Sequence, residues 1–523
     1  MAEVDVMNPD STIDSRLKRF FQKFLALRSA PRELWIIYAA YILENLAYKV
    51  GAAGVLPLWL SSDLGYGDVT AGAMIAGWSM TMTLITVMIG SLTDAMGIRR
   101  TFLLGFVICL AARIVMTVSV DKWVVLPFGL YPQALGLALM VPVMIAAVKK
   151  YTNVAQRSVA FSFYYALMNL GFAAGDWIFD RVRSPEKGLG EYGQWLLPVL
   201  GMELSTYRVL ILWSVVFTVP GLLLVWWFLR EGVEMTDKGV VITPKAAASK
   251  SGSWLVMLWK NCRETAVKTG RLFAGLWQQP AFYRFLGFMT LVVGVRMVFY
   301  HLAYTFPKYG IRELGDGAPI AQISSMLNSV MIVVLVPICG VLTQKITAYR
   351  MVTVGSLISA LSVFCLAVPS SVFKPLAAGW LGHFIAHQWL GVDGAVNPLY
   401  VAIFSFIVLL SIGEALWSPR LYEYAAAIAP KGQEASYMAL SLLPYFLAKF
   451  VVGGTSGWLL AKFCPADGPR HPGVMWFLIG CMALVTPLGT FLFRRFIQVQ
   501  EAGREPVISK AEAATTEEEN LRE

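Results

Sequence analysis

Charged residues are scarce in this sequence: Asp, Glu, Lys and Arg make up 15% of its 523 residues, while hydrophobic residues make up 57%. A soluble globular chain has about 25% charged and about 45–50% apolar residues. The apolar residues form blocks of roughly 20 or more, enough to cross a hydrocarbon core of about 30 Å as a helix. Short segments of alternating hydrophobicity are lacking, which argues against barrel strands. The sequence therefore predicts an all-α membrane protein.

Cysteine and histidine are also rare, with six and four copies. The cysteines are scattered without Cys-x-x-Cys or other metal-ligand spacing, so neither a disulfide framework nor a zinc site is implied. His383 and His387 share a helix face, but no third ligand stands near them, so we expect no metal. A nucleophile elbow, a Walker loop and a dinucleotide-binding glycine pattern are lacking too, which makes an enzyme the least favoured class.

Twelve apolar blocks are interpreted as transmembrane helices. They cover residues 34–60, 70–91, 100–120, 123–148, 157–179, 207–229, 284–306, 320–344, 350–369, 398–428, 435–461 and 473–495. A basic amphipathic stretch at 16–24 precedes the first block and is expected to lie on an anionic leaflet.

The blocks divide the chain into two bundles and the segments around them. The predicted divisions are a cytoplasmic amphipathic segment (1–33), an N-terminal six-helix bundle (34–229), a cytoplasmic linker (230–281), a C-terminal six-helix bundle (282–496) with an extracellular insertion (370–397), and a disordered tail (497–523).

The basic residues of the short loops predict the orientation. They are Arg28, Arg32, Arg99, Arg100, Lys149, Lys150, Lys345, Arg350, Arg494 and Arg495. With twelve helices they all lie on one side, which places both termini in the cytoplasm by the positive-inside rule. The net charge of +10 is explained by this bias, so we expect no nucleic acid as a partner. A plasma membrane or bacterial inner membrane fits such a chain.

An internal repeat relates the two halves. Gly90-Ser-Leu-Thr, at the end of the second block, aligns with Gly340-Val-Leu-Thr at the end of the eighth, an offset of 250 residues. Further positions agree at this offset: Pro57 with Pro307, Leu64 with Leu314 and Gly65 with Gly315. Two parallel halves of this kind rock against each other around a midplane site. The repeat therefore favours a carrier over a channel or a membrane enzyme.

The loop after the second block carries a spaced pattern of six residues: Gly90, Leu92, Asp94, Gly97, Arg99 and Arg100. This pattern resembles the cytoplasmic signature of the major facilitator superfamily. The resemblance implies about twelve transmembrane helices in two parallel six-helix halves. Gly97 permits a tight turn, and an ion pair between Asp94 and the arginines would latch one conformation. The alternative is a plain loop with stop-transfer charges.

Three further stretches resemble the proton-dependent oligopeptide transporter (peptide/nitrate transporter) family. They are 51–60 in the first block, 163–171 in the fifth, which contains Tyr165 and Asn169, and Gly413 to Pro419 in the tenth, followed by Ala429-Pro430. The resemblance implies uptake of a peptide-like or amino-acid-like solute. It assigns Glu414 to the amino group of the substrate.

The first and fourth blocks depart from the pattern of that family. The family carries Glu-x-x-Glu-Arg in the first helix, where this chain has Ile42, Asn45 and Leu46, and Glu44 is about 100° out of phase. In the fourth helix Val141 replaces the family's Lys. Both departures put standard proton-coupled peptide uptake in doubt.

Ionisable residues deep in the blocks are candidates for binding and coupling, because each costs at least about 2.5–3.5 kcal/mol to insert. The set comprises Glu44, Lys49, Arg113, Arg296, His301, Glu414 and Lys449. Basic residues outnumber acidic ones, which predicts a cation-rich cavity for a solute with a negative group. Glu44 and Lys49 are five residues apart, so each is expected to find a partner on another helix. For any single residue, a structural interhelical ion pair is the alternative.

The predicted function is secondary active transport of a small zwitterionic or anionic organic solute, driven by protons. A buried Glu414 would titrate near neutral pH and carry the proton, and His301 would act as a pH-sensitive gate. No cofactor beyond the proton gradient is expected, and the partners are substrate, proton and bilayer around a monomer. Two alternatives stay open: an exporter or facilitator without proton coupling, and a membrane sensor or scaffold that does not transport.

Overall fold

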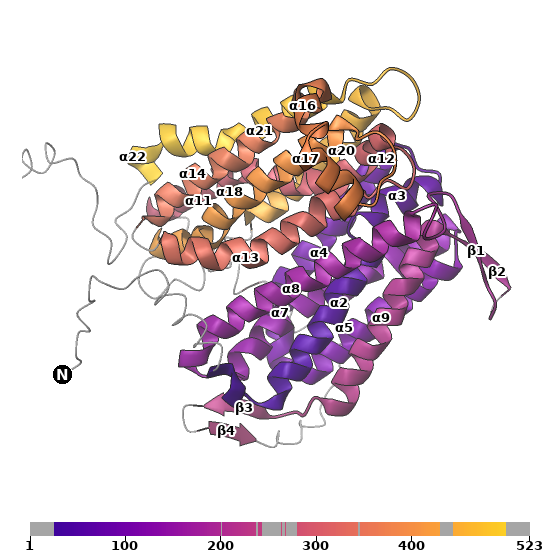
Figure 1. The fold of residues 1–523 in the computed structure, drawn as a ribbon. Helices are drawn as coiled ribbons and strands as arrows, with labels where there is room; N and C mark the ends of the chain where they lie inside the picture. The colour runs from indigo at the N-terminus through magenta and orange to yellow at the C-terminus, as the bar shows by residue number, and fades with distance from the viewer. Residues whose placement is uncertain are drawn as a thin grey trace, which may run out of the picture.

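The computed structural model describes residues 26–199, 201–236, 239–242, 280–343, 346–428 and 443–497, together with residues 263 and 267. The described chain is mostly helical (Figure 1). The predicted amphipathic stretch at 16–24, most of the linker, Ala429-Pro430 and the tail after Ile497 lie outside the described residues.

The first half contains a helix pair and five further long helices. Their bounds are α2 (Arg32–Gly51) with α3 (Val55–Ser62), α4 (Asp68–Met96), α5 (Ile98–Val118), α6 (Lys122–Val125) running through η2 (Leu126–Leu130) into α7 (Tyr131–Lys150), α8 (Val154–Arg183) and α9 (Thr206–Phe228). A short turn, η1 (Ala26–Ser29), precedes α2. Two antiparallel hairpins flank α9: β1 (Gln194–Leu197) with β2 (Met202–Ser205), and β3 (Val233–Thr236) with β4 (Gly239–Ile242).

The second half repeats this order. Its helices are α11 (Pro280–Tyr304) with α12 (Phe306–Leu314), η3 (Gln322–Met326) continuing as α13 (Leu327–Leu342), α14 (Ala348–Ser362) with α15 (Phe364–Ala367), α18 (Pro398–Ile428), α20 (Leu443–Phe463), α21 (Pro472–Leu492) and α22 (Arg494–Ile497). The predicted insertion forms four short helices: η4 (Ser370–Phe373), α16 (Lys374–Ala377), α17 (Trp380–His383) and η5 (Phe384–Trp389).

The described helices make up twelve segments of membrane length, six in each half. They coincide with the predicted blocks within about five residues, except that the part of the eleventh block before Leu443 lies outside the described residues. Nine of the described segments are apolar enough to cross a membrane by composition alone. The other three are α2, α8 and α20, which carry the ionisable residues Lys49, Asp176 and Lys449.

The internal repeat is also a structural repeat. In each half the first long helix breaks and continues as a shorter one, α3 or α12. Pro57 and Pro307 both lie in the first turn of the shorter helix. Gly65 and Gly315 follow these helices with φ angles of 66° and 96°, in a left-handed region that side chains disfavour. The predicted two-half architecture is therefore confirmed.

Two helix pairs join the halves: α4 packs on α20, and α8 packs on η3 and α13. The repeat relates these pairs, since α4 corresponds to α13 and α8 corresponds to α20. In addition α3 contacts α12 at the end of the molecule where the short insertion helices lie (Figure 1). We call this the insertion end, and the opposite end, which carries β3 and β4, the linker end.

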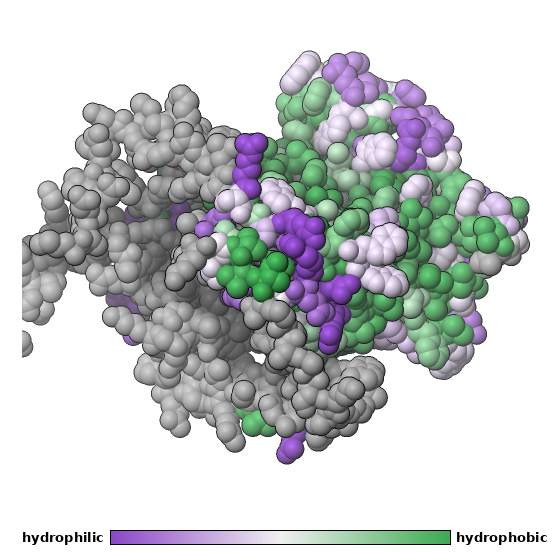
Figure 2. Space-filling model, turned by 90° about the horizontal axis from the view of Figure 1, so that it is seen from below, coloured by the Kyte–Doolittle hydropathy of each residue, from purple (hydrophilic) through white to green (hydrophobic). Residues whose placement is uncertain are grey.

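The surface between these ends is apolar. Hydrophobic residues cover much of the described surface in Figure 2. Large side chains such as Leu84, Trp213 and Leu361 are 40–52% exposed on α4, α9 and α14. Outward-facing apolar side chains on spans of this length are suited to a lipid solvent rather than to water.

Candidate substrate cavity

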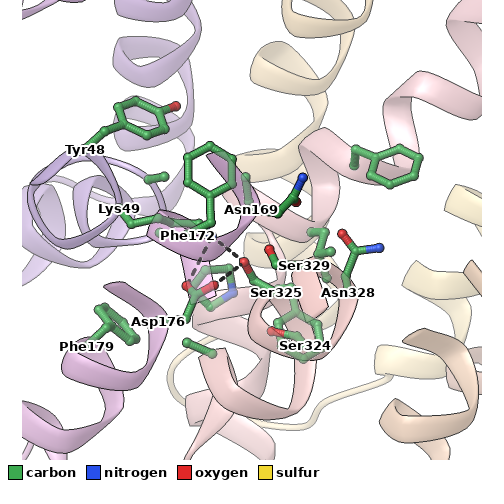
Figure 3. A pocket seen from close by; sticks show the side chains of 18 of the residues that line it. Tyr48, Lys49, Asn169, Phe172, Asp176, Phe179, Ser324, Ser325, Asn328 and Ser329 are labelled. Carbon is green, nitrogen blue, oxygen red and sulfur yellow. Dashed lines mark hydrogen bonds and ion pairs between the residues drawn. The ribbon is translucent and has the colours of Figure 1, made fainter. Parts of the chain in front are cut away.

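A cavity of about 290 Å³ lies between the two halves. It is at the lower end of the roughly 300–1,000 Å³ that small-molecule sites occupy. Its walls come from α2 and α8 on one side and from α11, η3, α13 and α18 on the other. The polar and aromatic lining residues include Tyr165 and Glu414. They also include Tyr48, Lys49, Asn169, Phe172, Asp176, Ser324, Ser325, Asn328 and Ser329, which are labelled in Figure 3.

An ion pair forms the polar wall of the first half. The Lys49 Nζ lies 3.1 Å from an Asp176 carboxylate oxygen, and both side chains are nearly buried. Ser325, which belongs to the second half, donates to the other Asp176 oxygen at 2.7 Å and accepts a hydrogen bond from Lys49. Figure 3 shows the three side chains meeting at one edge of the cavity.

The close packing of α2 on α8 positions this ion pair. A Cβ at Gly175 would lie 2.5 Å from the Cβ of Lys49, so only glycine lets the lysine stem pass across α8. Phe172, one turn earlier, places its ring 5.4 Å from the Lys49 Nζ. The ring face attracts the ammonium group, which holds Lys49 at the cavity wall.

The opposite wall carries Glu414. Its side chain accepts a hydrogen bond of 3.0 Å from Asn328, which also donates to Ser411. Nearby, the Arg296 guanidinium carbon lies 4.5 Å from the ring centroid of Trp417 and 4.0 Å from that of Tyr445. Arg296 therefore stacks between aromatic rings beside the cavity and is not among the residues that line it.

Tyr165 and Asn169 both line the cavity, as predicted from the fifth block. The Asn169 side chain donates to the Tyr165 backbone carbonyl at 2.9 Å, which fixes its orientation within α8.

Glu44 and Arg113 lie apart from the cavity. Arg113 on α5 donates to both carboxylate oxygens of Glu44, at 2.7 and 3.1 Å, and also to Thr218 on α9. Arg113 is fully buried and Glu44 is 5% exposed. The geometry is that of a structural interhelical ion pair, the alternative that the sequence had left open. The expectation that Glu44 and Lys49 find partners on different helices is confirmed.

Lys449 and His301 also lie outside the lining of this cavity. Lys449 on α20 donates to Thr83 on α4 at 2.8 Å and lines a second, smaller cavity of about 180 Å³ with Tyr48 and Tyr300. His301 is fully buried, and its Nδ1 pairs with the Thr305 hydroxyl at 2.8 Å.

The prediction of a cation-rich cavity is wrong for the residues described. The ionisable groups that line the central cavity are Lys49, Asp176 and Glu414, one base and two acids. The other predicted bases pair within one half, stack on aromatic rings or face the second cavity. Asp176 was missed because it lies near the predicted end of the fifth block at 179, whereas α8 continues to Arg183 and the residue is buried. Ser325 carries no sequence signal of comparable strength.

The arginines of the signature loop bind α9 and the segment after it. Gly97 has a φ angle of 87°, as a tight turn requires. Arg99 donates to the Trp226 carbonyl at 2.6 Å, and Arg100 lies 3.2 Å from Glu231. The side chain of Asp94 falls outside the described part of the chain, so the latch stays a prediction.

Ion pairs and capping bonds close the insertion end. Asp68 binds Lys308 at 2.7 Å and Arg312 at 2.9 Å across the two halves. Asp180 accepts hydrogen bonds from the backbone N–H groups of Ala321 and Gln322, at 3.2 and 2.6 Å. Its carboxylate thus caps the positive N-terminal end of η3 in the other half.

Beyond this seal lies an outer hollow of about 420 Å³ between the end of α8, the segment before η3 and the insertion. His383 and His387 lie in the insertion with ring centroids 4.7 Å apart, and His387 Nδ1 pairs with the Val392 carbonyl. Among the described residues no group of three or more His, Cys, Asp or Glu side chains is placed to hold a metal ion.

Twelve spans in two related halves around a shared cavity define a membrane carrier rather than an enzyme. The family model of the Major Facilitator Superfamily matches residues 35–405. The chain belongs to this superfamily, as the signature loop had indicated.

Solved structures of POT family transporters share the fold. One in complex with 5-aminolevulinic acid superposes with a TM-score of 0.62 at 15% identity, covering 90% of this chain and 97% of that one. One in complex with a thioalcohol-conjugated peptide has a TM-score of 0.63 at 16% identity, with 90% and 97% covered. A mutant peptide transporter in complex with sulfate has a TM-score of 0.64 at 15% identity, with 91% and 98% covered. No curated protein sequence matches the chain.

Proposed function

We propose that this chain is a secondary active transporter for a small zwitterionic organic solute, such as an amino acid or a short peptide, coupled to protons. The observation that carries the proposal is the placement of opposite charges on opposite walls of one cavity. Lys49 belongs to the first half and Glu414 to the second. A solute with a carboxylate and an ammonium group would therefore contact both halves at once.

The two contacts have distinct chemistry. Lys49 would bind the solute carboxylate by a charge-assisted hydrogen bond. Glu414 would bind the ammonium group, the role that the family resemblance assigns to it. The ligands named for two structural neighbours, 5-aminolevulinic acid and a conjugated peptide, belong to the same chemical class. The modest volume of the cavity favours solutes of about this size over longer chains.

Alternating access would open the insertion end. Passage of the solute through the insertion end requires the contacts of Asp68 with Lys308 and Arg312 to separate, together with the cap of Asp180 on η3. All of these join one half to the other, so they break together when the halves rock. A solute bound to both halves would stabilise the occluded state through which this motion passes.

A direct test is transport by the purified protein in proteoliposomes. With an inward proton gradient we expect accumulation of radiolabelled 5-aminolevulinic acid or of a dipeptide above its external concentration. A thermal-stability screen of peptides, amino acids, organic acids and phosphates would rank the solutes first. Binding without flux would contradict the proposal and favour a sensor or scaffold.

A facilitator or exporter without proton coupling is the second candidate. One specific observation favours it: α2 has Ile42, Asn45 and Leu46 at the positions of the family's Glu-x-x-Glu-Arg triad, and Glu44 is bound to Arg113. Uptake that is insensitive to a protonophore would support this candidate over the first.

A further inference from the structure

A residue of the second half completes the Lys49–Asp176 pair at the wall of the cavity. The Ser325 hydroxyl donates its one hydrogen to Asp176 and accepts from Lys49. The hydroxyl thus donates to an ionised acceptor and accepts from a charged donor, and charge-assisted hydrogen bonds are roughly twice as strong as neutral ones. The contact between the halves at this point therefore depends on the charge of Asp176.

Charge balance links this carboxylate to a substrate carboxylate. Lys49 and Asp176 are 12% and 6% exposed, so removing either charge alone leaves the other uncompensated at low dielectric. Protonation of Asp176 leaves Lys49 without its counter-ion. A solute carboxylate at Lys49 restores neutrality. Binding of the proton and binding of the anion then favour each other by the same free energy.

We infer that Asp176 is the proton-binding group of the transport cycle and that Lys49 passes from Asp176 to the solute carboxylate when the proton binds. The inference rests on the proposed function and deepens it. The proton adds to an Asp176 oxygen from water on one side and returns to water on the other, and no other covalent bond changes. Protonation of Asp176 changes its hydrogen bond with Ser325, and through this bond it affects the second half.

Glu414 is less suited to this role. Its described partner, Asn328, belongs to the same half, so protonation of Glu414 changes no described hydrogen bond between the halves. Protonation of Asp176 weakens the Ser325 contact directly. In this arrangement Glu414 stays ionised and binds the ammonium group of the solute. Asp176 on α8 couples proton binding to transport.

The other groups that face Asp176 leave it as the titrating group at this position. Lys49 is the charged residue of α2 that faces it, beside the Tyr48 phenol. On α8 itself Asp180 follows one turn later, held by Arg183 and by the η3 N–H groups. The remaining polar groups around the cavity are Tyr165 and Asn169 on α8, Ser324, Ser325, Asn328 and Ser329 on η3 and α13, and Glu414 on α18, while α11 contributes apolar residues.

Transport of radiolabelled 5-aminolevulinic acid in proteoliposomes tests the inference. Gradient-driven accumulation and counterflow without a gradient are measured for the wild type, Asp176→Asn and Glu186→Gln. Glu186 is an exposed acid at the outer hollow and serves as the matched control. We expect Asp176→Asn to lower the ratio of accumulation to counterflow about tenfold or more, and the control to keep the wild-type ratio. An unchanged ratio in Asp176→Asn would overturn the inference.

A second measurement needs no solute. Hydrogen–deuterium exchange of the segment 320–328 is followed between acid and neutral pH and corrected for the intrinsic pH dependence of exchange. We expect faster exchange at acid pH in the wild type and in Glu186→Gln, and fast, pH-independent exchange in Asp176→Asn. The same pH dependence in all three proteins would contradict the role of Asp176. A wild type with this pH dependence but without flux would instead contradict the proposed transport function.

Discussion

Lys308 on α12 donates a hydrogen bond of 2.7 Å to Asp68, the first residue of α4, and so ties the second half of the molecule to the first. Arg312, one turn further along α12, binds the same carboxylate. One acid therefore neutralises two bases of the other half, and the loss of Asp68 would break both contacts at once.

Replacement of Asp68 by Asn should open that end. The change leaves Lys308 and Arg312 without their shared counter-ion, and breaking a buried pair costs about 3–5 kcal/mol. Cys464 provides a natural probe, because it is fully buried and its backbone carbonyl accepts from Arg312. We expect labelling of Cys464 by a maleimide to rise about tenfold, measured by peptide mass spectrometry. Asp316→Asn, an exposed acid of the same end, is the control. Equal labelling in both variants would argue against the seal.

Glu44→Gln should lower the stability of the folded protein. It leaves the fully buried Arg113 uncompensated, so we expect a loss of roughly 3 kcal/mol in the free energy of unfolding. The double variant Glu44→Gln with Arg113→Met removes both charges and should recover part of that loss. Thermal unfolding in detergent measures both effects. If Glu44→Gln were as stable as the wild type but failed to bind solute, the pair would belong to the binding site after all.

Gly175→Ala should weaken solute binding. The added Cβ would lie 2.5 Å from the Cβ of Lys49, and overpacking of this kind costs about 1–3 kcal/mol of folding stability. Relief of this clash moves Lys49 away from the solute carboxylate, and we expect a loss of about fivefold or more in affinity. Gly454→Ala on α20 is a matched control, because a Cβ there would meet no atom within 4 Å. Equilibrium binding of 5-aminolevulinic acid compares the two variants. Equal affinities would show that the position of Lys49 is not critical.

Glu414→Gln should discriminate between two solutes that differ only in an amino group. Loss of a hydrogen bond to a charged group costs about 1.5–3 kcal/mol. We therefore expect affinity for 5-aminolevulinic acid to fall about ten- to a hundredfold, while affinity for levulinic acid stays near its wild-type value. Ligand-induced shifts in melting temperature report both. A similar loss for the two acids would remove Glu414 from the ammonium site.

Much of the fold could be predicted, because the insertion of a helix into a membrane depends on a local property, the apolarity of that segment. The length and apolarity of each block place a helix whatever its neighbours are. The cavity could be predicted only in part. Tyr165, Asn169, Lys49 and Glu414 line it as expected, whereas the arginines and Lys449 do not. Asp176 was missed because the predicted block 157–179 ends before α8 does, at Arg183, so the sequence placed this acid near a helix end.

The sequence by itself determined the twelve spans, the two halves related by 250 residues, and the superfamily. Only the tertiary structure decided which polar side chains meet. Glu44 and Lys49 both lie on α2. Glu44 pairs with Arg113 on α5, away from the cavity, whereas Lys49 pairs with Asp176 on α8 at the cavity wall. The rotation of a helix about its axis is set by packing with its neighbours, here by Gly175 against Lys49, and no local pattern in the sequence encodes it.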